Sequence, residues 1–235
     1  MPMNSKEITL KATTGGHFNA YLSTPPSGRG PGILLIQEIF GVNDHIRAVA
    51  DQYAMDGYTV LAPDVFWRVE PGVNLGYDTD GFGKGLELMG KMDFPQAIED
   101  LLLAAKHLKA MPEVTGKVAS LGYCMGGVLS YAVGSAPGSV DASVCYYGGG
   151  IHNHLDRAPS VMQPMLMHFA EQDAYIPPTA VESIRRAFES NKGVHIFTYP
   201  DVDHGFNCWA RGMYNQKASS LARGRTLEFL SRHIA

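Results

Sequence analysis

The stretch VASLGYCMGGVLSYAV, residues 118–133, contains a strand pattern and a helix pattern joined at an abrupt corner. The apolar run 118–121 predicts a buried strand, and the run 128–133 predicts the first turns of a helix. Three of the six residues between these runs are glycines, and Cys124 stands among them. A cysteine that only fills a core needs no such corner, so the pattern indicates a thiol that another molecule must reach.

The rest of the chain alternates strand and helix patterns around this stretch. An alternating segment on both sides of Thr14-Gly15-Gly16 predicts an antiparallel N-terminal hairpin. Residues 65–92 are rich in glycine and aspartate and predict a long loop. Further strands are predicted at 31–39, 59–64, 117–121, 142–148, 164–170 and 194–199, and helices at 43–57, 94–111, 126–135, 177–190 and 216–233. This order predicts a single α/β domain over residues 1–235, with a mostly parallel central sheet flanked by helices on both faces.

Four residues with chemically useful side chains lie at or just beyond the carboxyl ends of predicted strands. They are Glu38, Cys124, Asp173 and His204. Loops at that edge of a parallel sheet can bring them together although they are far apart in sequence. Nucleophile, acid and histidine follow one another in the order found on α/β-hydrolase sheets, where a G-x-S-x-G turn projects the nucleophile. Here a cysteine replaces that serine.

Over nearly its whole length the chain resembles the dienelactone hydrolase family, the carboxymethylenebutenolidases. The resemblance is carried by LLIQEIFGVNDHIRAVADQYAMDGYTVLAPD (34–64), VASLGYCMGG (118–127), EQDAYIPP (171–178) and DHGF (203–206). It implies a monomer, or at most a weak homodimer, with an α/β-hydrolase fold that opens lactone or ester bonds of small molecules.

The same resemblance implies a role for each polar residue of the site. Cys124 would be the nucleophile, His204 its base and Asp173 the acid that orients the histidine. Glu38 would hold the resting thiol and then deprotonate it. For the oxyanion hole, the backbone N–H groups of Met125 and Ile39 are expected to donate to the tetrahedral intermediate.

The chain departs from the family pattern where the substrate is bound. The family has His-Ser-Phe-x-Arg, whereas residues 204–208 are His-Gly-Phe-Asn-Cys, so Cys208 replaces an arginine. A second family arginine has no counterpart near residues 78–84. Without these guanidinium groups we expect a preference for neutral or weakly charged substrates. The cations that could bind a substrate anion in place of the missing arginines are Arg68, Lys84 and Arg211. The residues expected to line the substrate pocket are Tyr77, Phe82, Lys84, Phe206 and Trp209.

Composition excludes several functional classes. The formal net charge is −4, which favours neither nucleic acid nor an anionic membrane surface. No apolar run approaches the roughly 20 residues that span a bilayer. The first ten residues lack a signal-peptide pattern, and the three cysteines lack disulfide or zinc spacing, so we expect a cytoplasmic protein with reduced thiols. The histidines of HNH (152–154), His168 and His195 lack partner ligands at zinc-like spacing, so neither a metal nor a cofactor is expected.

Other interpretations of these residues remain open at this stage. Cys145 lies in an apolar strand pattern and is interpreted as a buried hydrophobic residue. Glu38 could cap the helix that begins near residue 43, and Asp201 or Asp203 could replace Asp173 as the partner of the histidine. For the whole protein, a redox sensor pairing Cys124 with Cys208 and a non-catalytic binding module on the same scaffold are the alternatives.

Overall fold

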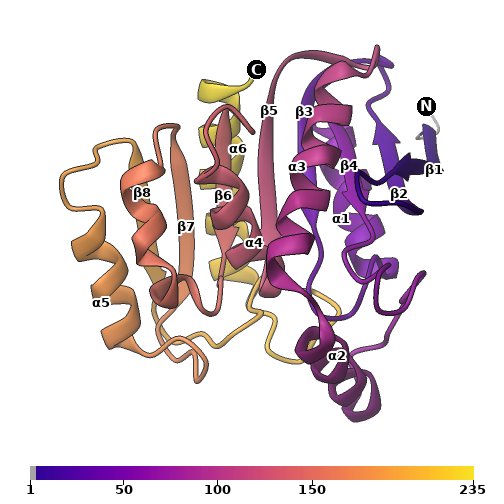
Figure 1. Ribbon diagram of the computed structural model, residues 1–235. Helices are drawn as coiled ribbons and strands as arrows, with labels where there is room; N and C mark the ends of the chain where they lie inside the picture. Colours follow the sequence, from indigo (N-terminus) through magenta and orange to yellow (C-terminus); the bar gives the residue numbers. More distant parts are fainter. Residues whose placement is uncertain (1–3) are drawn as a thin grey trace.

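The computed structural model describes residues 4–235 and shows one eight-stranded sheet flanked by helices (Figure 1). The strands lie side by side in the order β1-β2-β4-β3-β5-β6-β7-β8. Their bounds are β1 Asn4–Lys11, β2 His17–Thr24, β3 Gly30–Ile36, β4 Thr59–Pro63, β5 Val114–Tyr123, β6 Ala142–Tyr146, β7 Met165–Ala170 and β8 Val194–Tyr199. The expectation about the first ten residues also concerns residues 1–3, which lie outside the described part of the chain.

Strand pairing confirms the predicted mixture of one antiparallel hairpin and a parallel sheet. β1 and β2 pair antiparallel through a turn in which Gly15 and Gly16 have positive φ angles of 83° and 88°. β2 also pairs antiparallel with β4. β4, β3, β5, β6, β7 and β8 are parallel throughout. The carboxyl ends of these six strands therefore meet at one edge, where a parallel sheet presents its functional loops.

The helices cover both faces of this sheet. Their bounds are α1 Asp44–Met55, α2 Thr79–Lys91, α3 Phe94–Ala110, α4 Met125–Gly134, α5 Pro178–Ala187 and α6 Gln216–His233. In Figure 1, α3 and α4 lie in front of the sheet and α1 and α6 behind it, while α2 lies below its lower edge. Within residues 4–235, none of these helices has the length and apolar character to cross a membrane.

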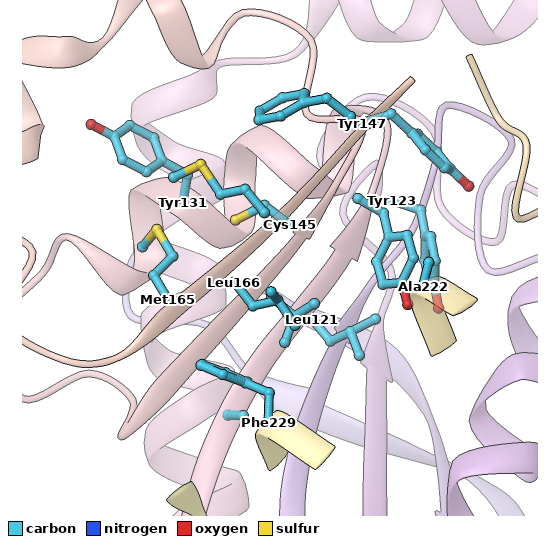
Figure 2. Packing of buried hydrophobic residues seen from close by; sticks show 14 of the residues in the cluster. Leu121, Tyr123, Tyr131, Cys145, Tyr147, Met165, Leu166, Ala222 and Phe229 are labelled. Carbon is cyan, nitrogen blue, oxygen red and sulfur yellow. The ribbon is translucent and has the colours of Figure 1, made fainter. Parts of the chain in front are cut away.

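The core is built from the strands and the apolar sides of the helices that cover them. Figure 2 shows strand residues such as Leu121 and Leu166 packed with Ala222 and Phe229 of α6. Cys145 is wholly buried in the same cluster, as its strand pattern predicted. Burial of these continuous apolar strands on both faces explains why the parallel part of the sheet could be recognised from sequence.

The segment 65–92 is not the long loop that its composition predicted. Residues Thr79–Lys91 form α2, which begins where the Asp78 side chain accepts a hydrogen bond from the Gly81 N–H at 2.7 Å. Four of its thirteen residues are glycines, and these hide the helical pattern because glycine is a poor helix former. Two 3₁₀ segments that the sequence did not indicate, Ile151–Asn153 and Leu155–Ser160, follow β6.

Candidate active site

Cys124 occupies a strained corner between β5 and α4. Its φ and ψ angles are 55° and −118°, a conformation that residues other than glycine rarely adopt. The corner is tight because α4 begins against the ends of β3 and β6. A Cβ atom on Gly126 would lie 2.2 Å from the Ile36 carbonyl oxygen, and one on Gly127 would lie 2.6 Å from that of Tyr146. The glycines thus allow the helix to start close to the sheet, which leaves the partly exposed thiol at its N-terminus.

His204 lies in the loop after β8 and is held by a carboxylate. Its Nδ1 is 2.7 Å from the Asp173 Oδ2, while Oδ1 of the same carboxylate accepts the backbone N–H groups of Tyr175 and Ile176. The rings of Tyr147 and Tyr175 pack against the imidazole at 5.0 and 5.2 Å between centroids. Asp173 and His204 are both buried, so this orientation is well defined.

The two competing acids are placed elsewhere. Asp203 is exposed and accepts the backbone N–H of His204 at 2.6 Å, and Asp201 is an exposed turn residue with a φ of 58°. The imidazole of His204 therefore has Asp173 as its carboxylate partner. This leaves Nε2 as the nitrogen that faces the thiol, because Nδ1 is already engaged.

The protonation of His204 depends on Cys124. Burial by itself would lower the pKa of His204, but the charge of Cys124 and the hydrogen bonds with Asp173 and Cys124 outweigh it and raise this pKa to about 10. The imidazole thus favours its protonated form beside the sulfur. An imidazolium next to a thiolate is the arrangement that makes a cysteine nucleophilic.

Two backbone N–H groups beside the thiol have no acceptor. The hydrogen bonds among residues 4–235 include none donated by the N–H of Ile39 or of Met125. Met125 is the first residue of α4, and Ile39 follows β3, the strand next to β5. Both residues also contribute to the wall of the pocket that contains Cys124. These amides can therefore donate to an oxygen atom bound in front of the sulfur.

Glu38 is buried, and its charge interacts with those of Arg211 and His204. The Tyr77 hydroxyl donates to its Oε2 at 2.9 Å, and the Arg211 Nη1 lies 3.7 Å from its Oε1. Burial raises the pKa of Glu38, and the charge of Arg211 and the hydrogen bond from Tyr77 offset part of that rise. Oε1 has no hydrogen-bond partner within the described part of the chain. In this structure the carboxylate thus holds Arg211 rather than the thiol, and it does not cap α1, whose N-cap is Asn43.

A pocket of about 490 Å³ opens in front of Cys124 and His204. Its wall includes Arg211, whose side chain is 12% exposed and lies over the ring of Phe40 at 5.5 Å. The remaining wall is mostly apolar and comes from α2, the start of α3, α4 and the 3₁₀ segment after β6, with Phe82, Leu86, Met89, Met92, Phe94, Val128, His152 and His154 among its residues. The pocket therefore combines a cation with an apolar surface.

Of the five pocket residues proposed from sequence, the structure places Phe82 in this wall. Tyr77 reaches the site indirectly, through Glu38 and Phe40. Phe206 is wholly buried against Tyr147 and Tyr199, and Trp209 lines two clefts outside the pocket. Both aromatic residues come shortly after His204 in sequence, but Phe206 points into the core and Trp209 toward the outer surface.

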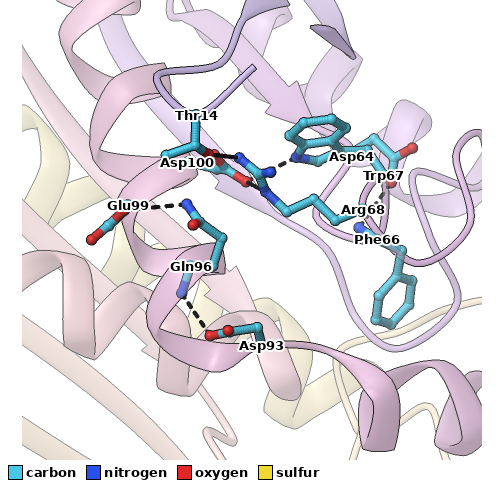
Figure 3. Close-up of polar contacts among 9 residues, drawn as sticks. All are labelled: Thr14, Asp64, Phe66, Trp67, Arg68, Asp93, Gln96, Glu99 and Asp100. Carbon is cyan, nitrogen blue, oxygen red and sulfur yellow. Dashed lines mark hydrogen bonds and ion pairs between the residues drawn. The ribbon is translucent and has the colours of Figure 1, made fainter. Parts of the chain in front are cut away.

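The structure also separates the three cations. Lys84 pairs with Glu70 at 2.8 Å outside the pocket wall. Arg68 is held by both carboxylate oxygens of Asp100, to which the Trp67 indole also donates (Figure 3). Arg211 alone among the three lines the pocket. The sequence named Arg211 as one of three candidates, and the fold of the 205–215 loop, which brings it back to Glu38, distinguishes it from the other two.

Cys208 and His168 are both buried among other side chains. Cys208 is wholly buried, and burial together with the nearby Glu38 charge raises its pKa to about 12. A resolving cysteine needs an accessible thiolate, so this environment does not favour a disulfide with Cys124. Both ring nitrogens of His168 are hydrogen-bonded, to Tyr199 and Thr226.

One group of metal-ligand side chains was not foreseen from sequence. Ligand atoms of Glu38, His45 and Cys208 lie within 4.8 Å of one another, and all three residues are buried. The Arg211 guanidinium already supplies a positive charge to this group, since it lies 3.7 Å from Glu38. Burial is the main reason why the pKa of His45 is lowered to about 4, and the charge of Arg211 lowers it further. The cluster is therefore balanced without an additional cation.

Comparison with known proteins gives one consistent result. The model of the dienelactone hydrolase family matches residues 18–234. A carboxymethylenebutenolidase of Pseudomonas sp. strain P51 is 33% identical over 231 residues, which cover 98% of this chain and 96% of the relative. Carboxymethylenebutenolidase 1 of Cupriavidus pinatubonensis is 31% identical and covers 97% of both chains.

A solved structure shows the same architecture. A Klebsiella pneumoniae protein described as a dienelactone hydrolase superposes with a TM-score of 0.85 and 26% identity, over 99% of this chain and 100% of the other. The match extends over the N-terminal hairpin as well as the parallel sheet. It therefore confirms the α/β-hydrolase fold for the whole described chain.

Proposed function

Since the chain belongs to the dienelactone hydrolase family and is thus an ester or lactone hydrolase, we propose that it cleaves small lactones or carboxylic esters through Cys124. His204 is its base and Asp173 orients the histidine. The observation that carries this proposal is the position of a partly exposed thiol on a strained corner, next to a buried His204–Asp173 pair. Two free amides, of Ile39 and Met125, complete the set of groups that acyl transfer requires.

The reaction follows from these positions. The Cys124 sulfur attacks the carbonyl carbon, and the negative oxygen that forms is bound by the Ile39 and Met125 amides. When the ester C–O bond breaks, the His204 imidazolium gives its proton to the leaving oxygen, and a thioester remains. His204 then takes a proton from water, the water oxygen attacks the thioester, and the C–S bond breaks to restore the thiolate. For a lactone, the alcohol and the acid are parts of one product.

The charge of the substrate is inferred from Arg211. The expectation of a neutral substrate rested on the absence of the two family arginines, with Arg211 among the three cations that could replace them, and Arg211 lines the pocket wall. The guanidinium is shared with Glu38 at 3.7 Å, a longer contact than a strong ion pair. A substrate carboxylate that binds Arg211 would therefore compete with Glu38 for it.

For Glu38 we propose a role as the group that responds to this competition. Its Oε1 is buried without a hydrogen bond, so little holds that oxygen in place when Arg211 turns to a substrate anion. If Cys124 rests as a neutral thiol beside the imidazolium, the released carboxylate, whose pKa is raised by burial, takes the thiol proton and the reaction above begins from the thiolate. Glu38 returns this proton to the sulfur after the thioester is hydrolysed. Glu38→Gln should then slow turnover of anionic substrates and change the rate at which iodoacetamide alkylates Cys124.

The test is a panel of small esters and lactones together with covalent labelling. Wild-type protein should hydrolyse part of the panel, and Cys124→Ala should lose about 10³-fold or more of that activity. Iodoacetamide should label Cys124, as located by mass spectrometry, and labelling should abolish turnover. Hydrolysis that survives in Cys124→Ala would overturn the assignment of the nucleophile.

Substrate charge is tested by comparing an anionic lactone with its methyl ester. Arg211→Met should lower kcat/KM for the anion about 10- to 100-fold and leave the methyl ester nearly unchanged, since a charge-assisted contact is worth ~1.5–3 kcal/mol. Arg186→Met is the matched control, because the Arg186 side chain on α5 is 77% exposed. Equal losses for both substrates would exclude Arg211 as the carboxylate-binding group.

A further inference from the structure

We propose that the site accepts substrates with an extended alkyl or aryl group, which lies in an apolar trough along α2. The trough is defined by Phe82, Leu86 and Met89 of α2 together with Met92 and Phe94. This inference rests on the proposed ester or lactone hydrolysis and concerns the shape and polarity of the substrate. It adds an apolar body to the carboxylate that Arg211 would bind.

The spacing of the trough residues on α2 provides the first evidence. Phe82, Leu86 and Met89 are four and then three residues apart, so they lie on one face of the helix and extend over roughly 10 Å. The ring of Phe82 lies 6.5 Å from that of Phe40, over which Arg211 is placed. A continuous apolar surface thus leads from the cation along α2.

The second piece of evidence is the solvent exposure of Leu86 and Met89. α2 packs on the protein through Gly81, Gly85 and Leu88, which are buried. Leu86 and Met89 are instead 41% and 38% exposed, although leucine and methionine are usually covered in a folded domain. Both line the pocket in front of Cys124. A bound apolar group would remove this surface from water.

A stacked pair of rings also contributes to the pocket wall beside the trough. The His154 ring stacks on Phe94 with centroids 5.3 Å apart and an interplanar angle of 6°. His152 and Asn153 of the 3₁₀ segment after β6 line the same pocket. With about 490 Å³, the cavity has the size at which pockets bind drug-sized ligands, whereas a lone five-membered lactone would leave most of it filled with water.

The experiment measures how activity depends on chain length. Two ester series, one lengthened on the acyl side and one on the alcohol side, extend from two to eight carbons. Each methylene that becomes buried is worth ~0.8 kcal/mol, so kcat/KM should rise up to about fourfold per methylene in at least one series and then level off. The double variant Leu86→Gln with Met89→Gln should lose at least fivefold with the eight-carbon ester and stay within twofold with the acetate.

Two controls separate the trough from general effects. Met162→Gln and Leu221→Gln also replace exposed apolar side chains, 83% and 48% exposed, but neither residue lines the pocket, so both should retain the wild-type chain-length dependence. Glutamine is a good helix former, so the α2 substitutions should leave that helix folded. A flat dependence in both series, or a double variant that keeps the wild-type slope, would overturn the trough.

A binding measurement makes the result independent of turnover. Octanoate should protect Cys124 from iodoacetamide at concentrations at least tenfold lower than acetate, and the double variant should remove most of that difference. Cys124-dependent hydrolysis of acetate esters with no chain-length dependence would overturn the trough and leave the proposed hydrolysis intact. Octanoate protection without hydrolysis of any ester would do the opposite.

Discussion

Two helices that contain glycine, α2 and α4, line the pocket in front of Cys124, and they use glycine for different reasons. In α4, Gly126 and Gly127 face backbone atoms of β3 and β6 at distances that leave no room for a side chain. In α2, Gly85 is similarly close to the Ile39 carbonyl oxygen, whereas Gly83 and Gly90 are exposed and a Cβ atom added to either would meet nothing within 4 Å. The glycines of α4 are required by packing, and two of those in α2 are not.

The difference shows how the two sides of the site are stabilised. α4 is a buried and mostly apolar helix, and it positions Cys124 through tight backbone contact. α2 forms despite its glycines, each of which costs ~1 kcal/mol relative to alanine in a helix interior. It is therefore held by tertiary contacts, chiefly those of Leu88 and of Gly85, which packs against Ile39.

The largest effect is expected at the corner itself. Gly126→Ala would place a methyl group 2.2 Å from the Ile36 oxygen and 2.5 Å from the Gln37 oxygen, both backbone atoms that cannot move freely. We expect a loss of about 3 kcal/mol or more in the free energy of unfolding, measured by urea denaturation. A variant as stable as wild type would show that α4 can shift away from β3.

The charge at the corner gives the second prediction. Burial alone would lower the pKa of His204, but other interactions outweigh it and raise this pKa to about 10. The charge of Cys124 and its hydrogen bond with the imidazole are two of these interactions. In Cys124→Ala these two contributions disappear while burial remains, so the pKa of His204 should fall. Titration of the imidazole by NMR in both proteins measures it, and an unchanged pKa would mean that Asp173 alone keeps His204 protonated.

A smaller effect is expected where α2 contacts Ile39, for which we propose an oxyanion-binding amide. In Gly85→Ala the added methyl group would lie 2.6 Å from the Ile39 carbonyl oxygen and 3.0 Å from its side chain. The shift of the Ile39 amide should lower kcat about tenfold, less than the 10²–10³ that complete loss of an oxyanion donor costs. The free energy of unfolding should decrease by no more than about 2 kcal/mol. Unchanged kcat would indicate that the Ile39 amide does not bind the oxyanion.

The smallest effects are expected at the open positions of α2. Gly83→Ala and Gly90→Ala should each stabilise the protein by ~0.5–1 kcal/mol, because alanine fits the helix and restricts the unfolded chain. Thermal unfolding measures the gain, and Gly85→Ala is the matched variant with the opposite expected sign. Destabilisation by either substitution would show that a side chain at Gly83 or Gly90 does meet neighbouring atoms.

The sequence by itself determined the sheet, the order of most of its elements and the position of Cys124 at a corner between strand and helix. Continuous apolar strands, separated helical patterns and a cysteine between glycines are local signals, and burial on both faces of the sheet makes them strong. Asp173 and His204 were found for the same reason, since residues after parallel strands must meet at one edge. Helix α2 escaped recognition because its glycines weaken the local pattern that its packing then restores.

Only the tertiary structure decided which side chains line the pocket in front of Cys124. Phe206 and Trp209 lie only two and five residues after His204, yet Phe206 is buried in the core and Trp209 lines outer clefts. Arg211 returns to the pocket through the fold of its loop, and Glu38 turns to it and to Tyr77. Side-chain direction in a loop depends on contacts between segments distant in sequence, so no pattern along the chain could contain it.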